Sequence, residues 1–451
     1  MSQRRMGERP DTEAVLRRLK GFQRDTVEYA FERLYTAPDS TRRFLVADEV
    51  GLGKTLVARG LIAKALDHLW EGPNEVDQID IVYICSNAQI ARQNVRRLQI
   101  GDGRFVRAAR LTLLPREIHG LRANRVNYIA LTPGTSFDLK SSMGIREERV
   151  LLYHMIQRVW PDFRAGPKNV FQGYVRKTSR FRWELTQFEN WYDIDADLAD
   201  AFADRLRESE GLQETYADLC QRFRRSRAHI PWEDRWRQIE FIGGLRSTLA
   251  EVCVDALEPD LVILDEFQRF KDLLVGEHAT AQLAKQLFTY SDEASDVRLL
   301  LLSATPYKMY TLHHERAEDD HYRDFLRTVE FLDAEPKKSQ HLHRLLEDYR
   351  QAMYRIESGT ENLVRIKEQI EAHLRRVMSR TERLRASEDA EGMMRQIPST
   401  GLELTADDVG DYLTLGEIGR EVGQPRVLEY WKAAPYLLSF MDDYKLKTEV
   451  V

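Results

Sequence analysis

The sequence predicts an α/β fold built around a parallel sheet. One reason is an apolar run at 44–47 that leads through a glycine-containing loop into a helical pattern. A second reason is the alternation of short apolar runs with helical patterns up to residue 131. The third is the return of short apolar runs at 261–264 and 299–302. Strands that alternate with helices typically pair in parallel and carry helices on their faces.

The first elements follow from capping and periodicity. Asp11-Thr-Glu-Ala carries the capping pattern of a helix start, and a second helix is expected over 22–35, before Pro38. Apolar residues recur at helical spacing after the glycine loop. The further predicted elements are a strand at 44–47, a helix at 55–70, a strand at 79–85, a helix at 88–98 and a strand at 128–131.

The strand–helix alternation stops near Asp138. Up to about Ala256 we expect only helices, rich in Arg, Glu and Trp, and after Thr305 the pattern is again mostly helical. The predicted division is an α/β domain over 1–137 plus 256–333, a large helical insertion over 138–255 and a helical C-terminal extension over 334–451.

Composition narrows the class of protein. The 451 residues are 43% hydrophobic and 31% charged, as in an ordinary globular protein, and no apolar run approaches the ~18 residues of a membrane span. The polar start Met1-Ser-Gln-Arg-Arg is unlike a signal peptide. Cys85, Cys220 and Cys253 lie far apart, which argues against a zinc site or disulfides. We therefore expect a cytoplasmic protein without a membrane partner.

The stretch Phe44–Thr55 has the layout of a phosphate-binding loop. Backbone N–H groups around Gly51, Leu52 and Gly53 can hold phosphate oxygens at a helix start. Lys54 can reach the β- and γ-phosphates, and Thr55 can ligate Mg²⁺. The predicted ligands are therefore ATP and Mg²⁺. Asp48 stands where the consensus has its first glycine.

Polar residues follow each of the later apolar runs. Asp265, in Leu264-Asp-Glu-Phe-Gln268, can hold Mg²⁺, and Glu266 can polarise the attacking water as general base. Ser303 and Thr305, in Leu302-Ser-Ala-Thr-Pro306, can sense these acids and couple them to a neighbouring domain, as can Gln268. The alternative is that both stretches are simple strand-end turns.

These motifs, in this order, resemble those of the superfamily 2 helicases and translocases. Asp48–Thr55 is similar to motif I of the SNF-type branch, Asp265–Gln268 to motif II and Ser303-Ala-Thr305 to motif III. The resemblance implies a RecA-like ATP-binding lobe. It also implies that Gln23, in Phe22-Gln23, reads adenine through its planar amide, unless it is a surface residue at a helix start.

The same resemblance implies an ATP-driven motor on DNA, with duplex DNA as the expected partner. Ser86 and Asn87 follow the second predicted strand, and Thr132, Gly134 and Thr135 follow the third, near the family's motifs Ia and Ib. Such hydroxyls and amides can bind backbone phosphates without reading bases. The alternative for both loops is a solvated turn.

The family's second RecA-like lobe carries an arginine finger in a Q-x-x-G-R-x-x-R motif, which this sequence lacks; Gly419-Arg420 has neither the glutamine nor the second arginine. We expect the chain to be the first half of a motor that needs a second lobe, in cis or in trans, and that hydrolyses ATP weakly or not at all alone. Val377–Arg383 is similar to the arginine-rich segment that follows motif III in SNF-type proteins.

Other functions stay open. An ABC-type ATPase should carry an LSGGQ-like signature, and none occurs. A nucleotide-binding scaffold that regulates a partner without turnover remains the alternative.

Basic and aromatic residues alternate at 174–183, 222–227 and 235–237, a pattern that suits nucleic acid. The alternative is a solvated helix face with buried tryptophans, because acids border each stretch.

Overall fold

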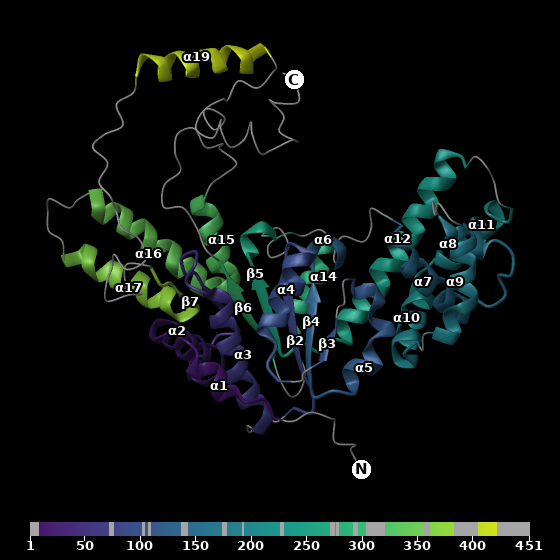
Figure 1. Cartoon of the computed structure of the whole chain (residues 1–451), viewed down its shortest axis with the longest axis horizontal. Helices are drawn as coiled ribbons and strands as arrows, with labels where there is room; N and C mark the ends of the chain where they lie inside the picture. Colours follow the sequence, from purple (N-terminus) through teal and green to yellow (C-terminus); the bar gives the residue numbers. More distant parts are fainter. Residues whose placement is uncertain are drawn as a thin grey trace. The chain divides into compact units, whose positions relative to one another are not determined.

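The chain divides into two compact units, Met1–Glu388 and Asp389–Val451. A computed structural model describes residues 9–71, 76–101, 104–106, 110–136, 143–173, 178–191, 194–225, 230–270, 276, 279–291, 296–303, 321–354, 361–382 and 405–421. In the second unit the described element is α19 (Ala406–Glu421). All other elements belong to the first unit (Figure 1).

A parallel sheet forms the centre of the first unit. Within the described residues seven strands pair in the order β3-β4-β2-β5-β6-β1-β7, and every neighbouring pair is parallel. The predicted α/β class with a parallel sheet is therefore confirmed. The strands are β1 (Arg43–Val46), β2 (Ile79–Cys85), β3 (Arg104–Val106), β4 (Val126–Leu131), β5 (Leu261–Asp265), β6 (Arg298–Leu302) and β7 (Met378–Ser379).

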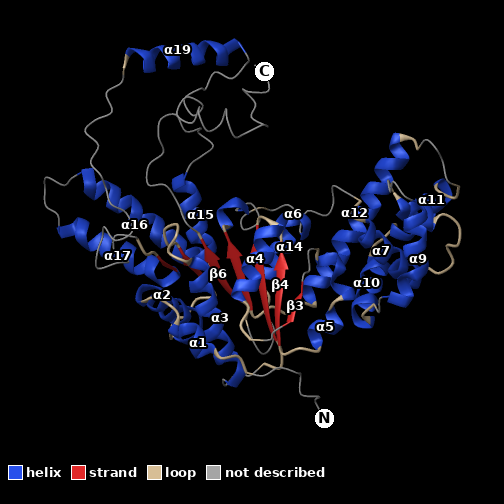
Figure 2. Cartoon of the chain, in the orientation of Figure 1, coloured by secondary structure: helices blue, strands red, loops and turns tan. Residues whose placement is uncertain are grey.

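Alternate residues of each strand point to opposite faces, and both faces are buried. Val46, Ile81 and Ile263 belong to one apolar cluster, which includes residues of the helices nearest the N-terminus. Leu45, Val82 and Leu264 belong to a second cluster on the other face. Figure 2 shows strands with helices on both sides. Burial on both faces explains why these strands read as continuous apolar runs and not as alternating ones.

Helices pack against both faces of the sheet. The first face packs against α1 (Thr12–Arg17), α2 (Gly21–Phe31), α3 (Lys54–Glu71) and α4 (Ala88–Leu98). The remaining short helices near the sheet are η1 (Glu32–Thr36), η2 (Leu111–Arg116), α5 (Ile118–Arg122), α6 (Pro133–Ser136), η3 (Phe267–Phe270) and α14 (Ala279–Phe288).

The described residues between 143 and 255 form helices and no strand, as predicted for that stretch. They are α7 (Arg146–Val159), α8 (Pro167–Gln172), α9 (Thr178–Trp191), α10 (Ala196–Glu208), α11 (Leu212–Arg222) and α12 (Trp232–Asp255). After the sheet come α15 (His321–Asp333), α16 (Pro336–Tyr354) and α17 (Glu361–Val377), which leads directly into β7.

The predicted strands at 44–47, 79–85, 128–131, 261–264 and 299–302 match β1, β2, β4, β5 and β6 to within two residues at each end. Two strands were not predicted. β3 has 3 residues and β7 has 2, so neither is long enough to show a periodic pattern. After Thr305 the described elements are helices apart from β7, which agrees with the mostly helical pattern predicted there. None of the described helices has the combined length and apolar character needed to cross a membrane.

A network around a buried ion pair joins helices of the 143–255 region to the sheet region. The Glu148 carboxylate of α7 accepts from Arg246 of α12 over 3.0 Å and from the hydroxyl of Thr112 in η2 over 2.6 Å. Arg110 reaches the same carboxylate over 3.2 Å. The side chains of Glu148 and Arg246 are both fully buried. A buried carboxylate is tolerated only when charge and hydrogen bonds surround it, so this network fixes how the helices pack.

Arg246→Met should therefore destabilise the first unit by roughly 3–5 kcal/mol, because it leaves the Glu148 carboxylate buried with fewer partners. Urea unfolding followed by tryptophan fluorescence measures the change. Arg237→Met is the matched control on the same helix, since Arg237 pairs with Asp218 over 3.4 Å at the surface. The control should cost at most about 1 kcal/mol, and equal effects of the two variants would contradict the assignment.

Candidate functional site

The predicted site residues gather at the carboxyl edge of the sheet. One row of paired residues runs across it, with Val46 of β1 level with Leu302 of β6 and Leu302 level with Asp265 of β5. Asp265 is in turn level with Cys85 of β2. The glycine loop, Ser303, Glu266 and Ser86 all follow directly after this row. In open parallel sheets, ligands bind outside the carboxyl ends of the strands.

The loop between β1 and α3 has the geometry that its glycines predict. Gly51 and Gly53 have φ values of 87° and 85°, in the left-handed region that favours glycine. A Cβ atom at Gly53 would lie 2.6 Å from Nε2 of Gln23, so a side chain there would displace the Gln23 amide. α3 begins at Lys54, so the loop leads into a helix N-terminus.

Lys54 folds back onto the loop that precedes it. Its ammonium group donates to the backbone carbonyls of Asp48 over 2.9 Å and of Glu49 over 3.1 Å. Burial lowers the pKa of Lys54, while the negative charges of Asp48, Asp265 and Glu266 act to raise it. The structure thus brings the loop lysine into the field of the acids that follow β5. Thr55 is the next residue of α3 and is half-buried.

Gln23 is not a surface residue, which removes that alternative. It is 4% exposed, and its Nε2 donates to the carbonyl of Leu52 over 2.8 Å. Its Oε1 accepts from the backbone N–H of Lys20 over 3.0 Å, which caps α2. The amide therefore braces the loop against the second helix, beside the predicted nucleotide site.

Asp265 ends β5 and is held from the neighbouring strand. The hydroxyl of Tyr83 donates to its Oδ2, and Nδ2 of Asn94 donates to the same oxygen over 3.3 Å. Glu266 follows with a φ of 54°. A non-glycine residue in the left-handed region carries strain of about 1–3 kcal/mol and is enriched at functional sites.

The predicted coupling residues are only partly described. Ser303 follows β6, is 1% exposed, and its backbone N–H donates to the carbonyl of Val46 over 3.1 Å. It therefore lies between the loop and Asp265. Gln268 lies in η3, half-buried, two residues after Glu266. Thr305 lies outside the described residues.

Several buried polar atoms at this edge have no hydrogen-bond partner among the described residues. They are Oδ2 of Asp48 and the side-chain oxygens of Ser86, Gln268, Ser303 and Ser379. Buried polar atoms are nearly always paired, so each such atom needs an explanation, such as a ligand or a water. Their position after neighbouring strands indicates an edge suited to a polar ligand.

Asp48 connects the loop to the last strand of the sheet. Its carboxylate is fully buried, and Oδ1 accepts from the backbone N–H of Thr381 over 2.8 Å. The N–H of Ala47 donates to the carbonyl of Ser379 over 2.8 Å, and the N–H of Glu49 donates to that of Thr381 over 3.1 Å. Burial raises the pKa of Asp48, and the hydrogen bonds from Thr381 and the charge of Lys54 oppose that rise.

The residues predicted to contact nucleic acid follow β2 and β4 along the same edge. Ser86 is half-buried, whereas Asn87 is exposed and its Oδ1 accepts from the N–H of Ile90 over 3.3 Å, near the start of α4. Thr132 is 8% exposed and its carbonyl accepts from the N–H of Ser136 over 2.9 Å. Gly134 is exposed within α6. Thr135 lies in α6, and its side chain is outside the described part of the chain.

The structure describes the basic stretches in part, over 178–183, 222–225 and 235–237. Arg222 pairs with Asp218 over 2.7 Å and with Asp234 over 2.9 Å, so its charge is already balanced. Trp232 and Trp236 are 69% and 55% exposed, so the expected burial of tryptophans is wrong for this pair.

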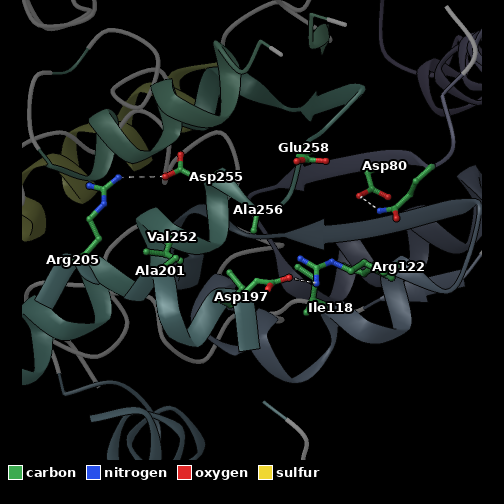
Figure 3. Close-up of a pocket in the computed structure, with 13 residues that line it drawn as sticks. Asp80, Ile118, Arg122, Asp197, Ala201, Arg205, Val252, Asp255, Ala256 and Glu258 are labelled. Carbon is green, nitrogen blue, oxygen red and sulfur yellow. Dashed lines mark hydrogen bonds and ion pairs between the residues drawn. The ribbon is translucent and has the colours of Figure 1, made fainter. Parts of the chain in front are cut away.

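A cavity of about 420 Å³ lies at the opposite edge of the sheet (Figure 3). Its walls come from the start of β2 at Asp80, from α5, from α10 and from the end of α12. The arginines in it are already paired: Arg122 with Asp197 over 3.2 Å, and Arg205 with Asp255 over 3.5 Å. None of the predicted site residues lines it, so we place the candidate site at the carboxyl edge.

No protein-family model matches this chain, and the search of curated proteins likewise found no match. Across the described ranges, no group of three or more His, Cys, Asp and Glu side chains is arranged to hold a metal ion. Mg²⁺ at nucleotide sites needs only one or two protein ligands besides the phosphates, so this absence does not bear on the predicted ligands Thr55 and Asp265.

Sequence reasoning missed Tyr83, Asn94 and Thr381. Tyr83 stands in a run of apolar residues and Asn94 in an ordinary helical pattern, so neither is marked by a motif. Thr381 lies 333 positions from its partner Asp48.

Asp48→Ala should release the N–H of Thr381 and speed its exchange with solvent by about tenfold, since one buried hydrogen bond to a charged acceptor is lost. Hydrogen exchange of the peptide that spans 377–382 measures this. Asp48→Asn is the control, because the amide oxygen can still accept. Unchanged protection in the alanine variant would show that the carboxylate does not hold β7.

Proposed function

We propose that this chain is a RecA-like ATP-binding lobe of a DNA helicase or translocase. The observation that carries the proposal is the convergence of Lys54 with Asp265 and Glu266 at one edge, after strands β1 and β5, which β6 separates. A glycine loop and a strand-end acid pair together are the parts that phosphoryl transfer from ATP requires. The resemblance to motifs I and II of superfamily 2 supports the same proposed function.

The residues would share the work as follows. Backbone N–H groups of the loop, at the start of α3, hold the phosphates. Lys54 exchanges the carbonyls of Asp48 and Glu49 for phosphate oxygens, which are charged and therefore stronger acceptors. Thr55 and Asp265 would hold Mg²⁺, which neutralises charge on the phosphates when bound. Glu266 orients and polarises the attacking water.

Ser303 directly follows β6, the strand that lies between β1 and β5, so its side chain can respond to changes at both the loop and Asp265. The DNA backbone would contact the loops after β2 and β4, at Ser86, Asn87, Thr132 and Gly134. A second lobe, in cis or in trans, would supply the arginine that this sequence lacks. The alternative is a nucleotide-binding scaffold without turnover, which shares the ATP site but not hydrolysis.

Lys54→Ala should weaken ATP binding about tenfold to a hundredfold, because a charge-assisted contact worth roughly 1.5–3 kcal/mol is lost. Isothermal titration calorimetry with ATP and Mg²⁺ measures the affinity. Lys64→Ala is the matched control on the same helix, where Lys64 pairs with Glu28 away from the loop. Full affinity in the Lys54 variant would refute the nucleotide site.

Glu266→Gln should retain ATP binding and lose turnover by about 10²–10⁴-fold, because the amide cannot accept the proton of the attacking water. A steady-state ATPase assay with and without duplex DNA tests the role of Glu266 as general base. The same assay tests the hypothesis that the protein is a DNA motor. Turnover by the wild type that DNA stimulates supports a motor. Tight ATP binding by the wild type with no turnover in either condition, and with an ATP affinity that duplex DNA does not change, would favour the scaffold.

A further inference from the structure

A buried tyrosine hydroxyl lies next to the acid that is proposed to hold Mg²⁺. Tyr83 is 2% exposed on β2 and pairs in register with Ile263 of β5. Asp265 is two residues further along β5, on the same face. Diagonal neighbours across two strands lie within reach of an aromatic side chain, and the Tyr83 hydroxyl accordingly donates to Oδ2 of Asp265.

Asn94 completes the arrangement from the helix that covers this face. Its Nδ2 in α4 donates to the Tyr83 oxygen over 2.9 Å and to Oδ2 of Asp265 over 3.3 Å. Both donors to the carboxylate thus end on one oxygen. Oδ1 is not used by either bond, so the carboxylate is fixed in orientation while one oxygen stays available.

The burial of Tyr83 supports its role as a donor. Burying a hydroxyl in an apolar cluster costs free energy unless it is hydrogen-bonded, and here the partner is the site carboxylate itself.

A second tyrosine shows what a purely structural role looks like. Tyr128 of β4 is 1% exposed and belongs to the same apolar cluster as Tyr83. Its hydroxyl accepts from the N–H of Ile100 over 3.0 Å, so it bonds backbone and no site residue. Tyr128 is therefore a matched comparison on the adjacent strand.

We propose that Tyr83 and Asn94 are positioning residues that orient Asp265 for Mg²⁺ through Oδ1. This inference rests on the proposed nucleotide site. Partners that orient a metal-binding carboxylate contribute to metal affinity, and their loss typically costs about 10–100-fold. The effect belongs to the Mg²⁺-dependent part of nucleotide binding, since neither residue lies on the phosphate-binding loop.

The test compares Tyr83→Phe, Asn94→Ala and the control Tyr128→Phe in the full chain. A fluorescent ATP analogue is bound first in EDTA and then during a Mg²⁺ titration. We expect Tyr83→Phe and Asn94→Ala to bind the analogue normally in EDTA. The Mg²⁺ concentration at half-maximal enhancement should rise about tenfold or more in these variants. Tyr128→Phe should leave both quantities unchanged.

The outcomes separate the two proposals. If the wild type responds to Mg²⁺ and Tyr83→Phe and Asn94→Ala respond at the same concentration, the positioning role is overturned while the nucleotide site stands. If the wild type does not bind the analogue with or without Mg²⁺, both proposals fail. If it binds the analogue equally well in EDTA and in Mg²⁺, the metal role of Asp265 and the positioning role of Tyr83 and Asn94 fail while the nucleotide site stands. Circular dichroism checks the fold of each variant, and Asn94→Ala, a change on the covering helix, tests the role even if Tyr83→Phe does not fold.

Discussion

The register of the parallel sheet is the constraint on which the site depends. Ser379, Val46, Leu302, Asp265 and Cys85 come from five different strands and pair level with one another. Side chains along a strand alternate between faces, so a slip of one residue in β5 would turn Asp265 to the opposite face. The acid would then point away from Tyr83 and Asn94. Because both faces are apolar, the register is held by the close packing of particular side chains on each face and not by an alternating pattern.

This constraint also explains what could be predicted from sequence. The α/β class, the parallel sheet and the placement of Lys54, Asp265 and Ser303 at one edge follow from local patterns. Asp265 and Ser303 directly succeed apolar runs, and Lys54 ends the glycine loop that succeeds another. Carboxyl ends of parallel strands meet at the same edge, so local knowledge is enough. Gln23 could be named from resemblance, although its contact with the carbonyl of Leu52 could not.

The partners of these residues could not be predicted, because they depend on which strands are neighbours. Tyr83 meets Asp265 only because β2 pairs with β5. The order of the strands along the chain does not show this, since β4 comes between β2 and β5 in the sequence. β7 has only 2 residues, and its place beside β1 comes from a chain segment that reads as helix. Sheet order is a long-range property, and short strands leave no periodic pattern from which to infer it.

The place of Asp48 in the loop illustrates how a departure from a consensus can be physically sound. Positive φ values occur at Gly51 and Gly53 but not at position 48, so the backbone there does not require glycine. A carboxylate can therefore occupy the position, and it binds the N–H of Thr381 while the carbonyl of the same residue accepts from Lys54. One residue thus joins the lysine of the loop to the last strand of the sheet. In the proposed function, Lys54 moves toward the phosphates and takes its positive charge away from the buried carboxylate of Asp48. The hydrogen bond between this carboxylate and the N–H of Thr381, just after β7, would then change in strength.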